Sequence, residues 1–197
     1  MIRHHCEIID SFTGSELIGR SYEPLFPGAV DRGESETAWT VIGADWVTTT
    51  DGTGVVHTAV MYGEDDYNLG MEVGLPAQHT VGMDGNFLEG THSELDGKYV
   101  KDCDDSIIQL MHESGLLYRE KMYLHDYPHC WRTGHPLLYY AMDSWFVKMT
   151  AVKDQLLKFN SEVEWAPDWV GQKRFGEWLR NVKDWAISRE RYWGTPL

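Results

Sequence analysis

Hydrophobic and polar positions in the first half of the chain follow a pattern that is typical of short strands and tight turns. Residues 37–50 mix β-branched and aromatic side chains, and the turn signal Asp51-Gly52-Thr53-Gly54 follows them. Val55 to Val60 then forms a short apolar run, and residues 75–101 carry repeated Gly and Asp. Because glycine and aspartate bound these runs, they indicate strands joined by turns. We therefore expect a β-rich body, with residues 55–60 as a mostly buried strand.

Two short helices are expected within this body. The first begins after Gly63 with three acidic residues in its first turn, where negative charge favours the positive end of the helix dipole. It ends at Gly74, since glycine is the preferred residue just after a helix. The second runs from about Asp104 to Glu113, has one apolar face, and stops at Gly115.

The apolar positions change to a helical period after about residue 140. One predicted helix face is formed by residues three or four apart, namely Trp145, Met149, Val152, Leu156 and Phe159. The same spacing recurs from Phe175 to Val182, and Pro167 and Gly171 separate the two predicted helices. A β-rich body followed by a helical part predicts the α+β fold class, with a division between residues 1–142 and residues 143–197.

Composition and charge limit the classes of protein to consider. The 197 residues are 42% hydrophobic and 13% aromatic, which is enough for a packed core. The formal net charge is −14, with 31 acidic against 17 basic residues, so the charge alone does not predict nucleic-acid binding through phosphates. Basic residues gather only between Lys173 and Arg191. Since the sequence has neither a membrane-spanning apolar run nor a secretory leader at its start, we expect a cytoplasmic protein.

The three cysteines give no sign of a disulfide framework or a metal site. Cys6, Cys103 and Cys130 are an odd number without a CxxC pair, which fits a reducing compartment. His4 and His5 stand beside Cys6, but such a cluster near a terminus is usually incidental.

The pattern with most chemical content joins a histidine to a carboxylate. His57 lies in the apolar run and Asp66 follows nine residues later at a predicted helix start, so a loop between them could bring both side chains into one cleft. A plainer interpretation is that Asp66 caps its helix and His57 is a satisfied core residue. Spacing alone favours this plainer interpretation.

Three longer motifs carry a family resemblance. They are GTGVVHTA at 52–59 with GEDDY at 63–67, PHCWR at 128–132 with Pro136, and DWAISRERYWGTPL at 184–197. With residues 16–27, these motifs resemble isoleucyl-tRNA synthetases, which are class I aminoacyl-tRNA synthetases, over almost the whole chain. The final Gly-Thr-Pro indicates the isoleucyl branch, because leucyl and valyl relatives carry other residues there.

The resemblance implies a fold and a function. Residues 1–142 would be a β-barrel-like editing domain of the isoleucyl, valyl and leucyl type, truncated at its N-terminus because no Thr-rich TTPWTLP-like strand is present. Residues 143–197 would be the helical segment that returns to the synthetic domain. The parent enzyme ligates isoleucine to its tRNA with ATP and magnesium, and this domain hydrolyses mischarged valyl-tRNA at its 3′ end. We expect a monomer that binds neither membranes nor DNA.

The resemblance also implies roles for single residues. Asp66 would hold the substrate's α-ammonium group, and His57 would line the side-chain pocket or orient the attacking water; these are the two catalytic candidates. Asp65 would replace Asp66 if the helix began one residue later. The remaining substrate-binding candidates are Thr58, Asp65, Gly54 and Tyr67. No Ser or Cys has an identifiable base partner, so we expect direct attack by water.

The chain departs from the family pattern at two positions. Val60 stands where the family usually has proline, and we expect this change to loosen the loop. Thr133 stands where many members have the second cysteine of a zinc-binding CxxC that begins at the position of Cys130. Since a structural zinc site needs four ligands, we predict no zinc and no other cofactor here. His129 and Cys130 are then predicted to be packing residues.

Other functions remain open from the sequence. The chain could be an inactive folded fragment, a weak binding module for the 3′ end of tRNA, or the editing domain of a valyl or leucyl relative. A free-standing editing hydrolase would have no use for the motif at 184–197.

Overall fold

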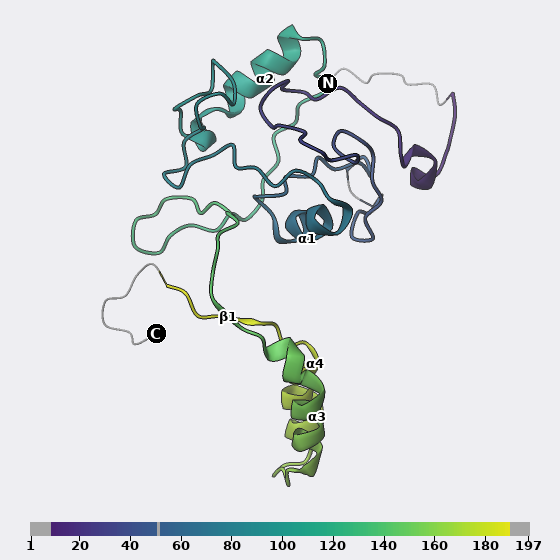
Figure 1. Ribbon diagram of the computed structural model, residues 1–197, viewed down its shortest axis with the longest axis vertical. Coiled ribbons are helices and arrows are strands. Elements are labelled where there is room, and N and C mark those ends of the chain that lie inside the picture. The colour runs from purple at the N-terminus through teal and green to yellow at the C-terminus, as the bar shows by residue number, and fades with distance from the viewer. Residues whose placement is uncertain (1–8, 51, 190–197) are drawn as a thin grey trace. The chain divides into compact units, whose positions relative to one another are not determined.

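The computed structural model describes residues 9–50 and 52–189, which form two compact units, Met1–Ala141 and Met142–Leu197 (Figure 1). The elements of the first unit are α1 (Glu64–Val73), α2 (Asp104–Glu113) and two short 3₁₀ turns, Gly14–Leu17 and Val100–Asp102. The second unit contains β1 (Phe146–Val147), a 3₁₀ turn (Met149–Val152), α3 (Lys153–Glu162), a π-helical turn (Val170–Phe175), α4 (Gly176–Arg180) and β2 (Trp185–Ala186). The described chain therefore mixes helices with a small open sheet. His4, His5, Cys6 and residues 190–197 of the last motif lie outside the described residues.

Local signals in the sequence define the two helices of the first unit correctly. Helix α1 follows Gly63, carries three acidic residues in its first turn, and ends at Gly74, which has a φ of 74°. A side chain at Gly74 would be strained in this left-handed conformation, so glycine is the natural stop. Helix α2 has the predicted bounds, Asp104–Glu113. Both predictions are confirmed.

The strands predicted in the first unit do not form ladders among the described residues. The pairing there consists of isolated bridges, Ser21–Thr40, Val81–Phe87, Asn86–Tyr99 and His129–Pro136. Around Val55 the Thr53 hydroxyl donates to the Val55 carbonyl at 3.0 Å and accepts from the Val55 amide at 3.2 Å. Such local side-chain bonds replace ladder bonds. Val55 is also 62% exposed, so the prediction of a mostly buried strand at 55–60 is wrong.

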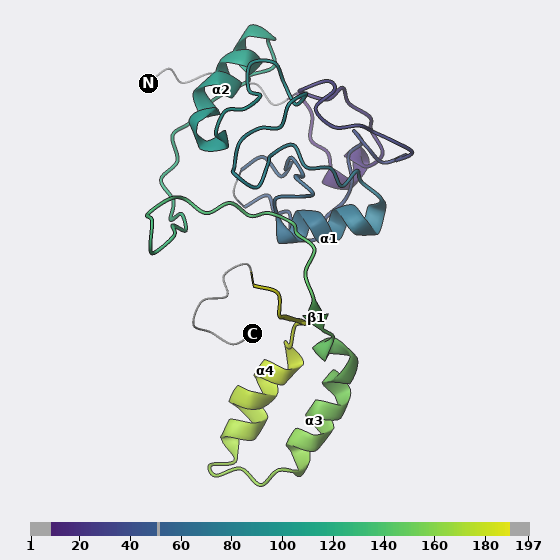
Figure 2. The same cartoon turned by 60° about the vertical axis from the view of Figure 1, so that its left-hand side comes forward.

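The second unit is a helical hairpin closed at its base by the two strands. Helices α3 and α4 lie side by side, and β1 pairs antiparallel with β2 through Phe146–Ala186 and Val147–Trp185 (Figure 2). The helix predicted from Trp145 begins only at Lys153, because Phe146 and Val147 pair with β2 and a 3₁₀ turn, Met149–Val152, follows them. The helix predicted over Phe175 to Val182 ends slightly earlier than its spacing suggests, since α4 ends at Arg180. Periodicity does not reveal these strands because each has only two residues.

The base of this hairpin is fastened by two side chains in addition to the strand pair. The Trp145 amide donates to the Ser188 hydroxyl at 2.8 Å. The Asp184 carboxylate accepts from both the Thr150 amide, at 2.9 Å, and the Thr150 hydroxyl, at 2.7 Å. These bonds hold the pKa of the Asp184 carboxyl below its ordinary value, and the bond from the Thr150 amide has the largest effect. Nearby Lys148 also lowers this pKa.

The Asp184 bonds predict a dependence on pH. A carboxylate whose pKa is lowered on folding stabilises the folded state above the ordinary aspartate pKa, and this contribution is lost as the pH falls through the folded-state value. We expect Asp184→Asn to speed exchange of the Thr150 amide by about threefold near neutral pH. The difference from wild type should narrow as the pH falls from about 6 toward about 3. Hydrogen exchange followed by mass spectrometry measures it, and a difference independent of pH would contradict the assignment.

Candidate functional site

The Asp66 carboxylate links the first turn of α1 to the segment that contains His57. Asp66 is the third residue of the helix and is half-buried. Its Oδ1 accepts a hydrogen bond from the Ala59 amide at 3.2 Å, and its Oδ2 lies against Gly63. The small residue at Gly63 leaves room for this carboxylate, which also lies in the positive field of the helix N-terminus. The Asp66 carboxylate is thus bound to the segment at Ala59, two residues after His57 in the sequence.

His57 and Thr58 immediately precede the Ala59 amide that Asp66 binds. The His57 imidazole is exposed and has no hydrogen-bond partner within the described chain, whereas Thr58 is half-buried. Asp66 bonds to Ala59 and makes no capping bond to its own helix. The plainer interpretation, with a capping aspartate and a satisfied core histidine, therefore fits neither residue.

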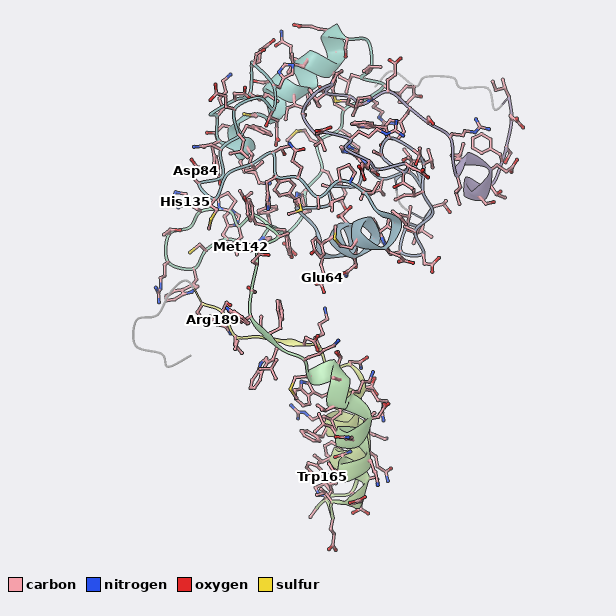
Figure 3. The ribbon with its side chains drawn as sticks, viewed as in Figure 1. Glu64, Asp84, His135, Met142, Trp165 and Arg189 are labelled. Atoms are coloured by element: carbon pink, nitrogen blue, oxygen red, sulfur yellow. The ribbon has the colours of Figure 1, made fainter. Side chains whose placement is uncertain are left out.

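The other candidate residues, Asp65, Tyr67 and Gly54, take no part in the bond between Asp66 and Ala59. The described helix begins at Glu64, so the later start that would favour Asp65 is not observed, and the Asp65 side chain is exposed. Tyr67 is exposed, and its amide makes the first bond of the helix, to Gly63 (Figure 3 marks Glu64 at this helix start). Gly54 has a φ of 75°, which a larger residue would adopt only with strain.

The turn between the two candidate catalytic residues is packed, although Val60 replaces the family's proline. Val60 is only 8% exposed. Both of its methyl groups lie 2.8 Å from the position that a Cβ on Gly70 of α1 would occupy. The valine side chain packs the turn against a glycine of the helix, and the expectation that the loss of proline loosens the loop stays a prediction.

A cluster of aromatic rings supports the same turn, and no motif of the sequence indicates it. The Tyr62 hydroxyl accepts from the amides of Thr80, at 2.7 Å, and Val81, at 2.8 Å. The Tyr140 hydroxyl donates to the Val81 carbonyl at 3.0 Å, and the His79 ring stacks on Tyr140 at 4.2 Å between centroids. Burial raises the pKa of Tyr140, with smaller contributions from Tyr62 and Asp84. These partners are far apart in sequence, so no local pattern predicts them.

The PHCWR motif forms a narrow hairpin whose tip contains Thr133. The Cys130 amide donates to His135 at 2.8 Å, and the Gly134 amide donates to Cys130 at 2.8 Å. Cys130 is half-buried, but His129 is exposed, so the prediction that His129 is a packing residue is wrong. Among residues 9–50 and 52–189, no three His, Cys, Asp or Glu side chains gather as metal ligands. The absence of zinc stays a prediction.

No described helix is long and apolar enough to cross a membrane.

Sequence comparison defines the class of protein. A model of class I tRNA synthetases (I, L, M and V) matches residues 59–197, so the chain belongs to the class I tRNA synthetase family.

The relatives within this family are isoleucine–tRNA ligases. The chain is 47% identical to the isoleucine–tRNA ligase of Clostridium novyi (strain NT) over 191 residues, which are 97% of this chain and 18% of the relative. It is 46% identical to that of Bacillus thuringiensis (strain Al Hakam) over 197 residues, which are 100% of this chain and 19% of the relative. The corresponding protein of Clostridium tetani (strain Massachusetts / E88) is 48% identical over 97% of this chain and 18% of the relative. The resemblance to isoleucyl-tRNA synthetases is confirmed, and the chain spans about a fifth of the length of these relatives.

Proposed function

We propose that this chain is a segment of an isoleucine–tRNA ligase. The support is that almost all of this chain matches part of proteins of that name, each about five times longer than this chain. In the parent, isoleucine would be joined to its tRNA with ATP and magnesium in domains outside this segment, which would need no cofactor of its own. A cytoplasmic, monomeric parent is consistent with this role.

Within that parent, we infer that residues 1–142 form the β-barrel-like editing domain, which removes valine from mischarged isoleucine tRNA. A single binding pocket rejects an amino acid that is smaller by one methylene with only about 1–3 kcal/mol, and isoleucyl-tRNA synthetase is itself the standard example of this limit. A second, smaller site can admit valine, exclude isoleucine and hydrolyse the ester. Residues 143–197 would lead the chain back to the synthetic domain.

The observation that carries this proposal is the Asp66 carboxylate bound to the Ala59 amide at 3.2 Å, two residues after an exposed His57. With one oxygen engaged by Ala59, the carboxylate keeps acceptor capacity for the α-ammonium of an aminoacyl ester, which is a charge-assisted contact. Thr58 would contribute a hydroxyl beside the ester. Asp65, Gly54 and Tyr67 would shape the surroundings of this contact.

The reaction would be hydrolysis without a covalent intermediate. Water, oriented by His57, would add to the ester carbonyl and lose a proton. The bond from the carbonyl carbon to the ribose oxygen would then break, the ribose oxygen would take up a proton, and valine and free tRNA would be released. Asp66 would hold the amino acid in the position where water attacks it, which is a contribution from orientation.

The test compares ester loss from valyl-tRNA and isoleucyl-tRNA. We expect the full-length synthetase that contains this segment to hydrolyse the valyl ester and spare the isoleucyl ester. Equal rates for the two esters would contradict a size-selective site. The same assay on the 197-residue chain alone separates a hydrolase from a module that only binds the 3′ end, since binding without ester loss would favour the latter.

A further inference from the structure

Each residue of the turn Ala59–Tyr62 is held by a different part of the first unit. The Ala59 amide binds the Asp66 carboxylate, and the Ala59 carbonyl accepts from the Tyr62 amide at 2.9 Å. Val60 packs on Gly70 of α1, and the Met61 carbonyl accepts from the Ala141 amide at 2.9 Å. The position of the Ala59 amide, which binds Asp66, is therefore fixed by the shape of this turn.

Tyr62 fixes this turn through its backbone and its side chain at once. Its amide closes the turn on Ala59, while its hydroxyl oxygen accepts from the amides of Thr80, at 2.7 Å, and Val81, at 2.8 Å. Val81 is buried, and Thr80 is half-buried. Loss of the hydroxyl would leave both amides without this acceptor in a place that water reaches poorly, so the turn would shift to find new partners.

The surrounding rings hold the Tyr62 side chain in one orientation. Tyr62 meets His79 and Tyr140 edge-on, with centroids 5.8 Å and 5.9 Å away. His79 and Tyr140 are themselves stacked, with 10° between their planes. Because aromatic pairs in these geometries attract, the cluster is a rigid support for the hydroxyl.

We propose that Tyr62 is a positioning residue of the editing site: by docking its hydroxyl on the amides of Thr80 and Val81, it holds the turn whose Ala59 amide binds the Asp66 carboxylate. This inference rests on the proposed editing function. Tyr62 acts through Ala59 and Asp66 and does not touch the substrate.

The test measures binding of a non-hydrolysable analogue, 3′-valylamino-3′-deoxyadenosine, to the full-length synthetase by calorimetry. Its synthetic site is first blocked with an isoleucyl-adenylate analogue. We expect Tyr62→Phe to weaken binding about tenfold and to speed exchange of the Ala59 amide by a similar factor. Asp66→Ala should weaken binding further. Because Tyr62 acts through Asp66, Tyr62→Phe should add almost nothing to the loss in an Asp66→Ala background.

Tyr127→Phe is the matched control. It removes a hydroxyl that donates to the Leu137 carbonyl at 2.7 Å in the PHCWR hairpin, so it costs a tyrosine–backbone hydrogen bond away from the turn. It should leave analogue binding unchanged, whatever its effect on melting temperature.

Three results would overturn the inference or its basis, and they can be told apart. If Tyr62→Phe lowers only the melting temperature and leaves binding and Ala59 exchange unchanged, Tyr62 is merely structural. If the loss of analogue affinity in the double variant equals the product of the losses in the two single variants, Tyr62 does not act through Asp66. If Asp66→Ala itself leaves binding and deacylation intact, the proposed function is wrong, even where Tyr62→Phe still alters Ala59 exchange.

Discussion

Replacement of Asp66 by alanine is expected to slow hydrolysis of valyl-tRNA by the full-length synthetase about a hundredfold, because a charge-assisted hydrogen bond to the substrate is lost. The Ala59 amide loses its acceptor in the same step, so the turn beside His57 is also freed. The measurement is single-turnover ester loss from valyl-tRNA. Isoleucine-dependent exchange of pyrophosphate into ATP, which reports the synthetic site, should not change.

Two neighbouring acids on α1 make this experiment specific. Glu72→Ala removes an exposed carboxylate near the end of the same helix and should leave deacylation unchanged. Asp65→Ala tests the neighbouring candidate, and its effect should be much smaller than that of Asp66→Ala, since the Asp65 side chain is exposed. A normal rate for Asp66→Ala, or a larger loss for Asp65→Ala, would refute the assignment of Asp66.

The second large effect is expected at Gly171, in the helical hairpin. Alanine in place of glycine usually stabilises a helix, by about 1 kcal/mol. A Cβ at Gly171, however, would run into the Trp165 indole, which is held by a bond to the Asn160 carbonyl at 3.4 Å and by contact with Phe175 at 5.2 Å between centroids. We expect Gly171→Ala to lower the free energy of unfolding by about 1–3 kcal/mol. Thermal or denaturant unfolding, followed by tryptophan fluorescence, measures this.

A matched glycine and a compensating change distinguish this clash from a general effect of alanine. Gly14 has no heavy atom near the position of an added Cβ, so Gly14→Ala should be neutral or slightly stabilising. Trp165→Leu should make the hairpin less sensitive to Gly171→Ala, because the ring that meets the new methyl group is gone. Additive losses in the double variant would show that the indole is not the cause.

The sequence predicts those parts of the fold that depend on neighbouring residues. Acidic residues after Gly63 and the stop at Gly74 define α1 without reference to the rest of the chain, and α2 follows in the same way. The strand pair Phe146–Val147 and Trp185–Ala186 joins residues about 40 positions apart, and each strand is too short to show alternation. The pairing therefore overrides the helical period that Trp145 suggests.

In the candidate site, too, the sequence predicts the residues that local motifs contain and does not predict the contacts between distant residues. One motif contains both His57 and Asp66, and the preceding glycine and the acidic first turn are local signals that predict Asp66 at a helix start. The contact of Val60 with Gly70 and the bonds of the Tyr62 hydroxyl depend on the folded path of the chain. The packing of Val60, which departs from the family pattern, depends on Gly70, a partner ten residues away that no local signal indicates.

The strand pair at the base of the helical hairpin has a consequence for how this region tolerates change in length. Hydrogen-bonded strands lie about 4.8 Å apart, so the chain enters the helices and leaves them at almost the same point. Whole helical turns can then be gained or lost between Lys148 and Asp184 without moving the two paired strands at the base of the hairpin. We therefore expect the hairpin to tolerate changes of whole helical turns, while the short ladder keeps its two ends together.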